Sequence, residues 1–221
     1  MITALLILTN PLKANVASGN SLEWQFEVFL DKQPIGFHDF TVTTSGVETK
    51  IESRAQFDVK LLFVNVFSYR HDNVENWVSN CLSTISSTTT SNGERFDVRG
   101  SMSVDGGFQL ENTRQIARPN CVTTFAYWDS SFLNSTQLLN PQTGTYESVE
   151  STLVGQELFE LDTQTVAANK YLLETKDGPI SLWYAVDNNR WLGLESIAKG
   201  GRVIRYKARS LPATPQQIVS N

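Results

Sequence analysis

Apolar and polar residues alternate with a period of two along most of this chain, which constrains the fold more than any other sequence feature. In residues 22–30 the even positions are Leu, Trp, Phe, Val and Leu, whereas Glu23, Gln25 and Glu27 occupy odd positions. Successive side chains of a strand point to opposite faces of the sheet. The pattern therefore predicts strands with one buried face. The same alternation recurs in residues 47–57.

Short turn-forming segments separate these runs, as expected for antiparallel strands joined in sequence. The predicted strands cover residues 22–30, 35–44, 47–63, 64–67, 74–79, 82–90, 94–104, 108–112, 145–154, 156–162, 166–176, 180–186, 191–198 and 202–209. So many strands favour an all-β fold, a large curved antiparallel meander sheet forming an open half-barrel. A closed up-and-down barrel is the alternative. Arg205, Lys207 and Arg209 share one face of the last run, which is typical of a guarded sheet edge.

The domain organisation follows from the same pattern and from composition. We expect a secretory signal segment in residues 1–20, one β-rich domain in 21–211 and a flexible tail in 212–221. The signal interpretation rests on an apolar run at 2–8 followed by small residues, and the alternative is a partly buried N-terminal segment. The protein would then be periplasmic or otherwise exported. No apolar run is long enough to predict a transmembrane anchor.

Composition excludes several classes of protein. Hydrophobic residues make up 40% of the chain and charged residues 19%, which excludes disorder over most of its length. The net charge is -5 and no basic block is present, so nucleic acid is not an expected partner. Cys81 and Cys121 form an even pair without metal-binding spacing, so a disulfide is the simplest interpretation, with two buried thiols as the alternative.

The candidate catalytic residues are His38, His71, Glu75 and Asp129. A histidine beside a carboxylate can act as a general acid or base. Two widely spaced histidines do not predict a metal site, and no nucleotide-binding glycine loop or hydrolase elbow is present, so we expect neither metal nor cofactor. Asp72-Asn73 resembles a hairpin turn that would place Arg70 opposite Glu75, which favours a structural role for that pair.

Aromatic residues are the candidate ligand-binding residues. Phe125, Tyr127 and Trp128 lie in a long irregular stretch at 117–144, in which Asp129 is the expected N-cap of a short helix. These side chains either contact a ligand or plug one end of the curved sheet. Tyr69 and Trp77, on either side of His71, complete the predicted ligand-binding set.

The same residues give the chain a resemblance to a family of exported bacterial proteins, domain of unknown function 6134. The likeness extends from about Trp24 to Tyr206, and the matching blocks are Ile35-Gly36 with His38, Tyr69, His71, Glu75, Trp77, Cys81-Leu82, Cys121-Val122, residues 125–128, 138–140 and 143–144, Trp183-Tyr184, Trp191 and residues 194–196. The resemblance implies export and supports the cysteine pair. It implies no activity, cofactor or catalytic residue. A looser similarity to periplasmic lipoprotein carriers concerns only the fold.

Together these features favour an exported protein that binds or carries an apolar, lipid-like ligand on a concave sheet. Burial of hydrocarbon would supply the affinity, so no charged catalyst is required. One alternative is an enzyme with His71 as acid or base, and another is a partner in cell-envelope assembly.

Overall fold

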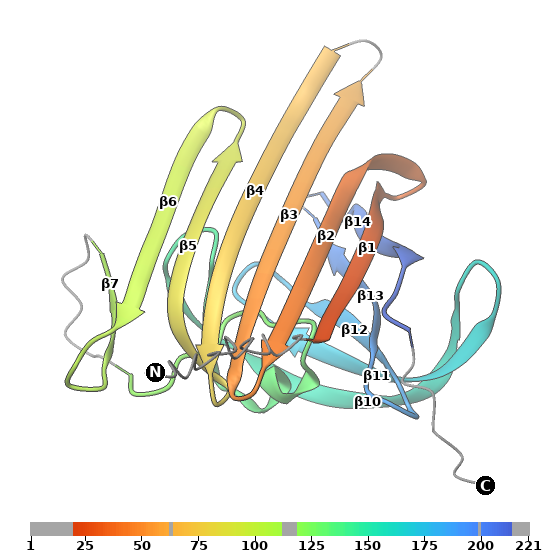
Figure 1. Ribbon diagram of the computed structural model, residues 1–221. Helices are drawn as coiled ribbons and strands as arrows, with labels where there is room; N and C mark the ends of the chain where they lie inside the picture. The colour runs from red at the N-terminus through yellow and green to blue at the C-terminus, as the bar shows by residue number, and fades with distance from the viewer. Residues whose placement is uncertain (1–19, 62–63, 112–118, 199, 214–221) are drawn as a thin grey trace, which may run out of the picture.

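The computed structural model describes residues 20–61, 64–111, 119–198 and 200–213, and most of them belong to one large β-sheet (Figure 1). Its strands are β1 (Asn20–Leu30), β2 (Gln33–Ser45), β3 (Glu48–Leu61), β4 (Val64–Val78), β5 (Cys81–Ser91), β6 (Glu94–Met102), β7 (Phe108–Leu110), β10 (Glu150–Glu160), β11 (Thr165–Glu174), β12 (Ile180–Ala185), β13 (Trp191–Ile197) and β14 (Val203–Ser210).

The order of these 12 strands is β10-β11-β12-β13-β14-β1-β2-β3-β4-β5-β6-β7, and all neighbours are antiparallel. The sheet curls strongly, so that β13 and β14 lie behind β1 and β2, and β10 and β11 cross below them in Figure 1. Within the described residues the edge strands β10 and β7 do not pair. The predicted all-β, open meander is therefore confirmed, and the closed barrel is not formed.

The concave face contains the hydrophobic core. On β1, Trp24, Phe26 and Val28 are buried, whereas Glu23 and Gln25 are exposed, as the alternation predicts. Phe26 contacts the ring of Trp191 from β13 at a centroid distance of 4.5 Å, so the two ends of the chain share one core. Burial of these large side chains is the main force that holds the curved sheet around its hydrophobic core.

The predicted hairpin at Asp72-Asn73 is wrong, because β4 continues without a break through both residues. Asp72 and Asn73 pair with β3 on one side and with β5 on the other. The turn comes later, at Ser79 and Asn80, where both residues adopt positive φ angles. Hydrogen bonding to two neighbouring strands outweighs the local turn preference of an Asp-Asn pair.

The interpretation of the last strand as a guarded edge is also wrong. β14 lies inside the sheet, between β13 and β1. Its three cations instead form exposed ion pairs with neighbouring strands and loops, Arg205 with Glu195, Lys207 with Asp162 and Arg209 with Asp39. A row of cations on one face of a strand is compatible with an interior position when acidic partners lie beside it.

The irregular segment between β7 and β10 packs onto the concave face. Asp129 caps a short 3-10 helix, Ser130–Asn134, as expected, and β8 (Gln137–Leu139) pairs with β9 (Tyr146–Ser148). Phe132 and Leu138 enter the main core, and a disulfide joins Cys121 to Cys81 at the start of β5. The chain itself therefore fills part of the concave face.

The proposed signal segment lies outside the described residues except for Asn20, which begins β1, and most of the proposed tail lies outside them as well. No helix in the described part of the chain has the length and hydropathy needed to cross a membrane.

Candidate functional site

The described residues of the concave face enclose two adjoining cavities. The larger one, of about 600 Å³, has mainly apolar walls, and we call it the apolar chamber; its lining includes Leu30, Ile35, Phe57, Val59, Phe67 and Ile204. The smaller one, of about 170 Å³, is the polar chamber; its lining includes Ser53, His71, Asn73, Glu75, Thr124 and Glu147. His38, Tyr127, Gln142 and Ile180 line both chambers and therefore mark their junction.

Strand register places the two histidines beside this junction. His38 on β2 pairs with Ala55 on β3, and Ala55 pairs with His71 on β4. The three residues thus form one row across the inner face, with Cα atoms of the histidines about 10 Å apart at the usual strand spacing. The structure therefore brings together two candidates that are far apart in sequence.

Both imidazoles are held by hydroxyl groups. His71 Nδ1 lies 2.9 Å from Thr89 Oγ1, and His38 Nδ1 lies 3.0 Å from the hydroxyl of Tyr206 on β14. Burial lowers the pKa of His71 to about 4 and lowers the pKa of His38 well below its usual value, since a charged imidazolium would lose its hydration. Both rings are therefore uncharged at neutral pH.

Glu75 extends the polar row on β4 and is 2% exposed. Its carboxyl group accepts hydrogen bonds from Asn73 Nδ2 and Trp77 Nε1, both at 2.9 Å, and from Thr124 Oγ1 at 3.0 Å. Burial raises the pKa of Glu75, and the three hydrogen bonds oppose that rise. These donors also fix the irregular segment, through Thr124, against β4.

Two buried polar atoms of the chamber walls have no hydrogen-bond partner among the residues that the structure describes. They are Nε2 of His38 and Oδ1 of Asn73, a residue that is 6% exposed. An unpaired polar atom in a protein interior costs about 1–3 kcal/mol, so such atoms are normally satisfied by a ligand or by water. Their presence in one cavity indicates a site that accepts a polar group.

The predicted aromatic residues divide between cavity lining and packing. Phe125, Tyr127 and Trp128 line the polar chamber, and Tyr69 lines the apolar chamber. Trp77 lies outside both linings; it is buried, donates to Glu75 and packs edge-to-face on Trp128 at 5.8 Å. The loop aromatics therefore cover part of the concave face and also form cavity walls, and their contact with a ligand stays a prediction.

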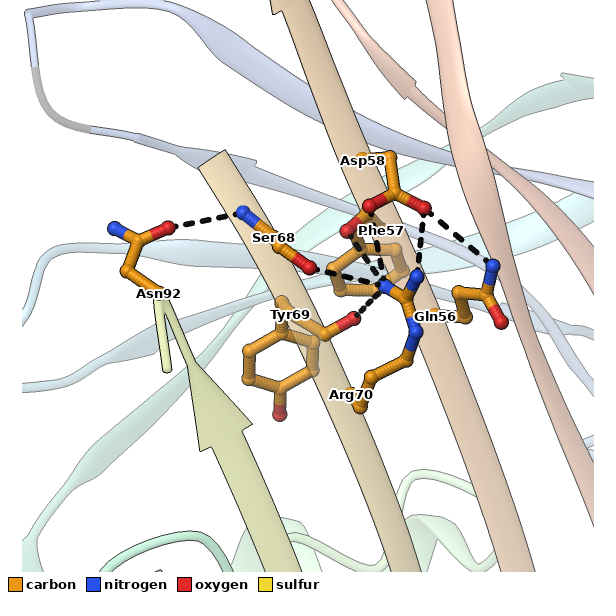
Figure 2. Close-up of polar contacts among 7 residues, drawn as sticks. All are labelled: Gln56, Phe57, Asp58, Ser68, Tyr69, Arg70 and Asn92. Atoms are coloured by element: carbon orange, nitrogen blue, oxygen red, sulfur yellow. Dashed lines mark hydrogen bonds and ion pairs between the residues drawn. The ribbon is translucent and has the colours of Figure 1, made fainter. Parts of the chain in front are cut away.

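Arg70 and Asp129 lie apart from these chambers. Arg70 forms an ion pair at 2.9 Å with Asp58 of β3, rather than the expected pair with Glu75, because β4 contains no hairpin at residue 72 (Figure 2). Its guanidinium also donates to the backbone carbonyls of Phe57 and Tyr69. Asp129 accepts from the Ser131 amide and is a helix cap. In the described residues no cluster of three His, Cys, Asp or Glu is placed to hold a metal ion.

Sequence reasoning missed Ser53, Asn73, Thr124 and Glu147. Ser53 and Asn73 lie opposite each other on β3 and β4 and carry polar groups at inward positions. Continuing the alternation of Tyr69 and His71 through Trp77 would have placed Asn73 and Glu75 on the buried face. Polar residues at buried strand positions were therefore the available signal. Thr124 and Glu147 lie outside the main sheet, and no comparable pattern marks them.

Comparisons with known proteins agree with this architecture. A family model described as "Domain of unknown function (DUF6134)" matches residues 26–209. No curated protein matches the chain. Among solved structures, a beta-barrel-like protein of domain of unknown function DUF1849 from Brucella abortus is similar, with a TM-score of 0.64 and 12% sequence identity over 88% of this chain and 98% of that one. At this identity the likeness shows a shared fold alone.

Proposed function

This chain belongs to the DUF6134 family, and from that premise we propose that it binds or carries an apolar, lipid-like ligand inside its curved sheet. The observation that carries this proposal is the apolar chamber of about 600 Å³, open on the concave face and bordered by aliphatic and aromatic side chains. Its size falls within the usual range for small-molecule sites, roughly 300–1,000 Å³. The polar chamber adds an end at which a ligand can be oriented.

Hydrocarbon burial is sufficient to drive such binding. A chain that removes ~300 Å² of apolar surface from water gains about 7 kcal/mol before the entropic cost of association. Much of the apolar chamber wall comes from β1–β4 and β14, which are hydrogen-bonded to one another in the sheet. A pre-formed cavity avoids part of the ordering cost that a flexible site would impose.

The state of the histidines favours binding over the enzyme alternative. A general base works best when its pKa lies near the working pH, whereas His71 has a pKa of about 4. Each described imidazole hydrogen bond goes to a hydroxyl group rather than to a carboxylate that would stabilise a charged ring.

We also propose that the protein acts in the periplasm or another exported compartment. The Cys81–Cys121 disulfide supports this location, because disulfides persist mainly in oxidising compartments. Localisation of a tagged chain, with the state of the two cysteines probed by a thiol reagent, tests it. A reduced protein confined to the cytoplasm would contradict the proposal.

Binding of a fluorescent apolar probe, N-phenyl-1-naphthylamine, tests the proposed function. We expect saturable binding by the wild type and at least a tenfold loss in Ile204→Trp, whose indole would occupy the apolar chamber. Val47→Trp is the matched control, because Val47 is 68% exposed. Melting curves verify that both variants fold. A wild-type protein without saturable binding, or an unaffected Ile204→Trp variant, would overturn the proposal.

A further inference from the structure

We infer that the polar chamber recognises an uncharged, hydroxyl-bearing head group on the ligand whose hydrocarbon chain occupies the apolar chamber. This inference rests on the proposed function and specifies its ligand class. It would make the protein selective among amphiphiles of equal chain length.

The unpaired atom of Asn73 requires a hydrogen-bond donor. Asn73 Nδ2 already donates to Glu75 Oε1 at 2.9 Å, which fixes the amide so that Oδ1 is left as the acceptor. That oxygen is buried without a partner, on a side chain that is 6% exposed. A hydroxyl group on the ligand can supply the missing donor.

The unpaired atom of His38, Nε2, is either a hydrogen-bond donor or an acceptor, depending on the tautomer of the ring. If the Tyr206 hydroxyl donates to His38 Nδ1, the neutral ring carries its proton on Nε2 and needs an acceptor. If Nδ1 donates to Tyr206, Nε2 needs a donor instead. A hydroxyl group is both donor and acceptor and satisfies either tautomer. Because His38 lies at the junction of the chambers, a head group beside it leaves its chain in the apolar chamber.

An anionic head group has no cationic partner in this chamber. The described lining residues include no Lys or Arg, whereas Glu75 and Glu147 are buried and Asp177 lies at the exposed rim. A carboxylate or phosphate placed there would lose its hydration without gaining a charge partner. Such a head group is therefore rejected.

A cationic head group has no available buried carboxylate in this chamber, since Asp177 lies at the exposed rim. Glu75 already accepts three hydrogen bonds, and Glu147 accepts from Asn140 and forms an ion pair with Lys176 at 3.1 Å. An ammonium group would have to displace these partners while losing its own hydration. The uncharged class is the one that the described wall accommodates.

Three amphiphiles with the same C14 chain provide the test: 1-monomyristoylglycerol, myristate and tetradecylamine. Each is titrated below its critical micelle concentration at pH 7.5 as a competitor of N-phenyl-1-naphthylamine. We expect the monoglyceride to bind at least tenfold more tightly than either charged compound. We expect Asn73→Leu and, independently, His38→Phe to reduce this preference to about threefold or less while probe binding persists.

Asn76→Leu is the matched control, since Asn76 lies on the same strand with its side chain exposed on the opposite face. It should retain the wild-type preference. Equal affinities for the three compounds would show a chamber filled by water only and would overturn the inference while leaving the proposed function intact. Preference for the anion or the cation would also overturn the inference. Failure of all three compounds and of the probe would overturn the proposed function itself.

Discussion

At the scale of single residues, the inner face of β4 carries side chains that are both polar and buried, a combination that is uncommon in a protein core. His71, Asn73 and Glu75 occupy successive inward positions, and all three are buried. Each is held by a specific partner, which reduces the cost of removing a polar group from water. Such a row is less stabilising than aliphatic side chains would be. Its presence in a cavity wall is consistent with a binding role.

The buried histidines predict acid sensitivity. In the unfolded chain a histidine has a pKa of about 6.5, whereas the folded state holds the pKa of His71 at about 4. Between these values the unfolded state binds more protons, so stability falls as pH decreases. His71 should lower the free energy of unfolding by about 2 kcal/mol between pH 7.5 and pH 5, and His38 acts in the same direction.

Urea unfolding at the two pH values measures this effect, with His71→Gln as the comparison. The variant should lose markedly less stability on acidification than the wild type does. The raised pKa of Glu75 acts in the opposite sense, because the folded state then takes up a proton first. Identical pH dependence in wild type and variant would contradict the assignment of a depressed pKa to His71.

At the scale of elements, the hairpin of β3 and β4 carries much of the site and is fastened from its outer side. Figure 2 shows the Arg70 guanidinium directed at Asp58 and at the backbone around Phe57 and Tyr69. The rings of Phe57 and Tyr69 stack at 5.1 Å and line the apolar chamber. The outer contacts therefore hold the backbone that carries two wall residues.

We predict that Arg70→Gln destabilises the protein by about 1 kcal/mol, a value that allows for the partial exposure of the ion pair. Arg54→Gln is the matched control on the same two strands, because Arg54 and Asp72 are 71% and 70% exposed and 3.7 Å apart. That change should cost roughly 0.5 kcal/mol or less. Equal effects in chemical denaturation would indicate that Arg70 is only another surface charge.

At the scale of the whole molecule, the chain forms one curved open sheet, and the segment between β7 and β10 covers part of its concave face. β14 returns to pair with β1, and the segment after β7 enters the concave face. This arrangement leaves the two chambers between the main sheet and the loop aromatics. The lining of the site therefore combines residues from both ends and from the centre of the sequence.

The disulfide should contribute strongly to this closure. Cys81 and Cys121 are separated by 40 residues, and on the chain-entropy model a cross-link of that length stabilises by about 4 kcal/mol. We expect the Cys81→Ala/Cys121→Ala variant to lose roughly that amount in urea unfolding, and the wild type in reducing agent to behave similarly. A loss below about 1 kcal/mol would show that packing of Phe132 and Leu138 alone holds the segment in place.

The sequence by itself determined which side chains face inward. Alternation in residues 22–30 and 47–57 is a local property, since each residue's face depends only on its position along the strand. The open meander follows from the same alternation, and Asp129 as a helix cap follows from the local preference for Asp at that position. The error at Asp72-Asn73 arose because a local turn preference was given more weight than pairing with two neighbours.

Only the tertiary structure decided which inward faces meet and how much space they leave. The contact between His38 and Tyr206 joins residues 168 positions apart, and the pairing of β14 with β1 has no local signature in the sequence. Cavities arise where the volumes of distant side chains fail to fill the space between elements. The two chambers, and the unpaired atoms of His38 and Asn73 within them, therefore follow from the packing of the whole chain.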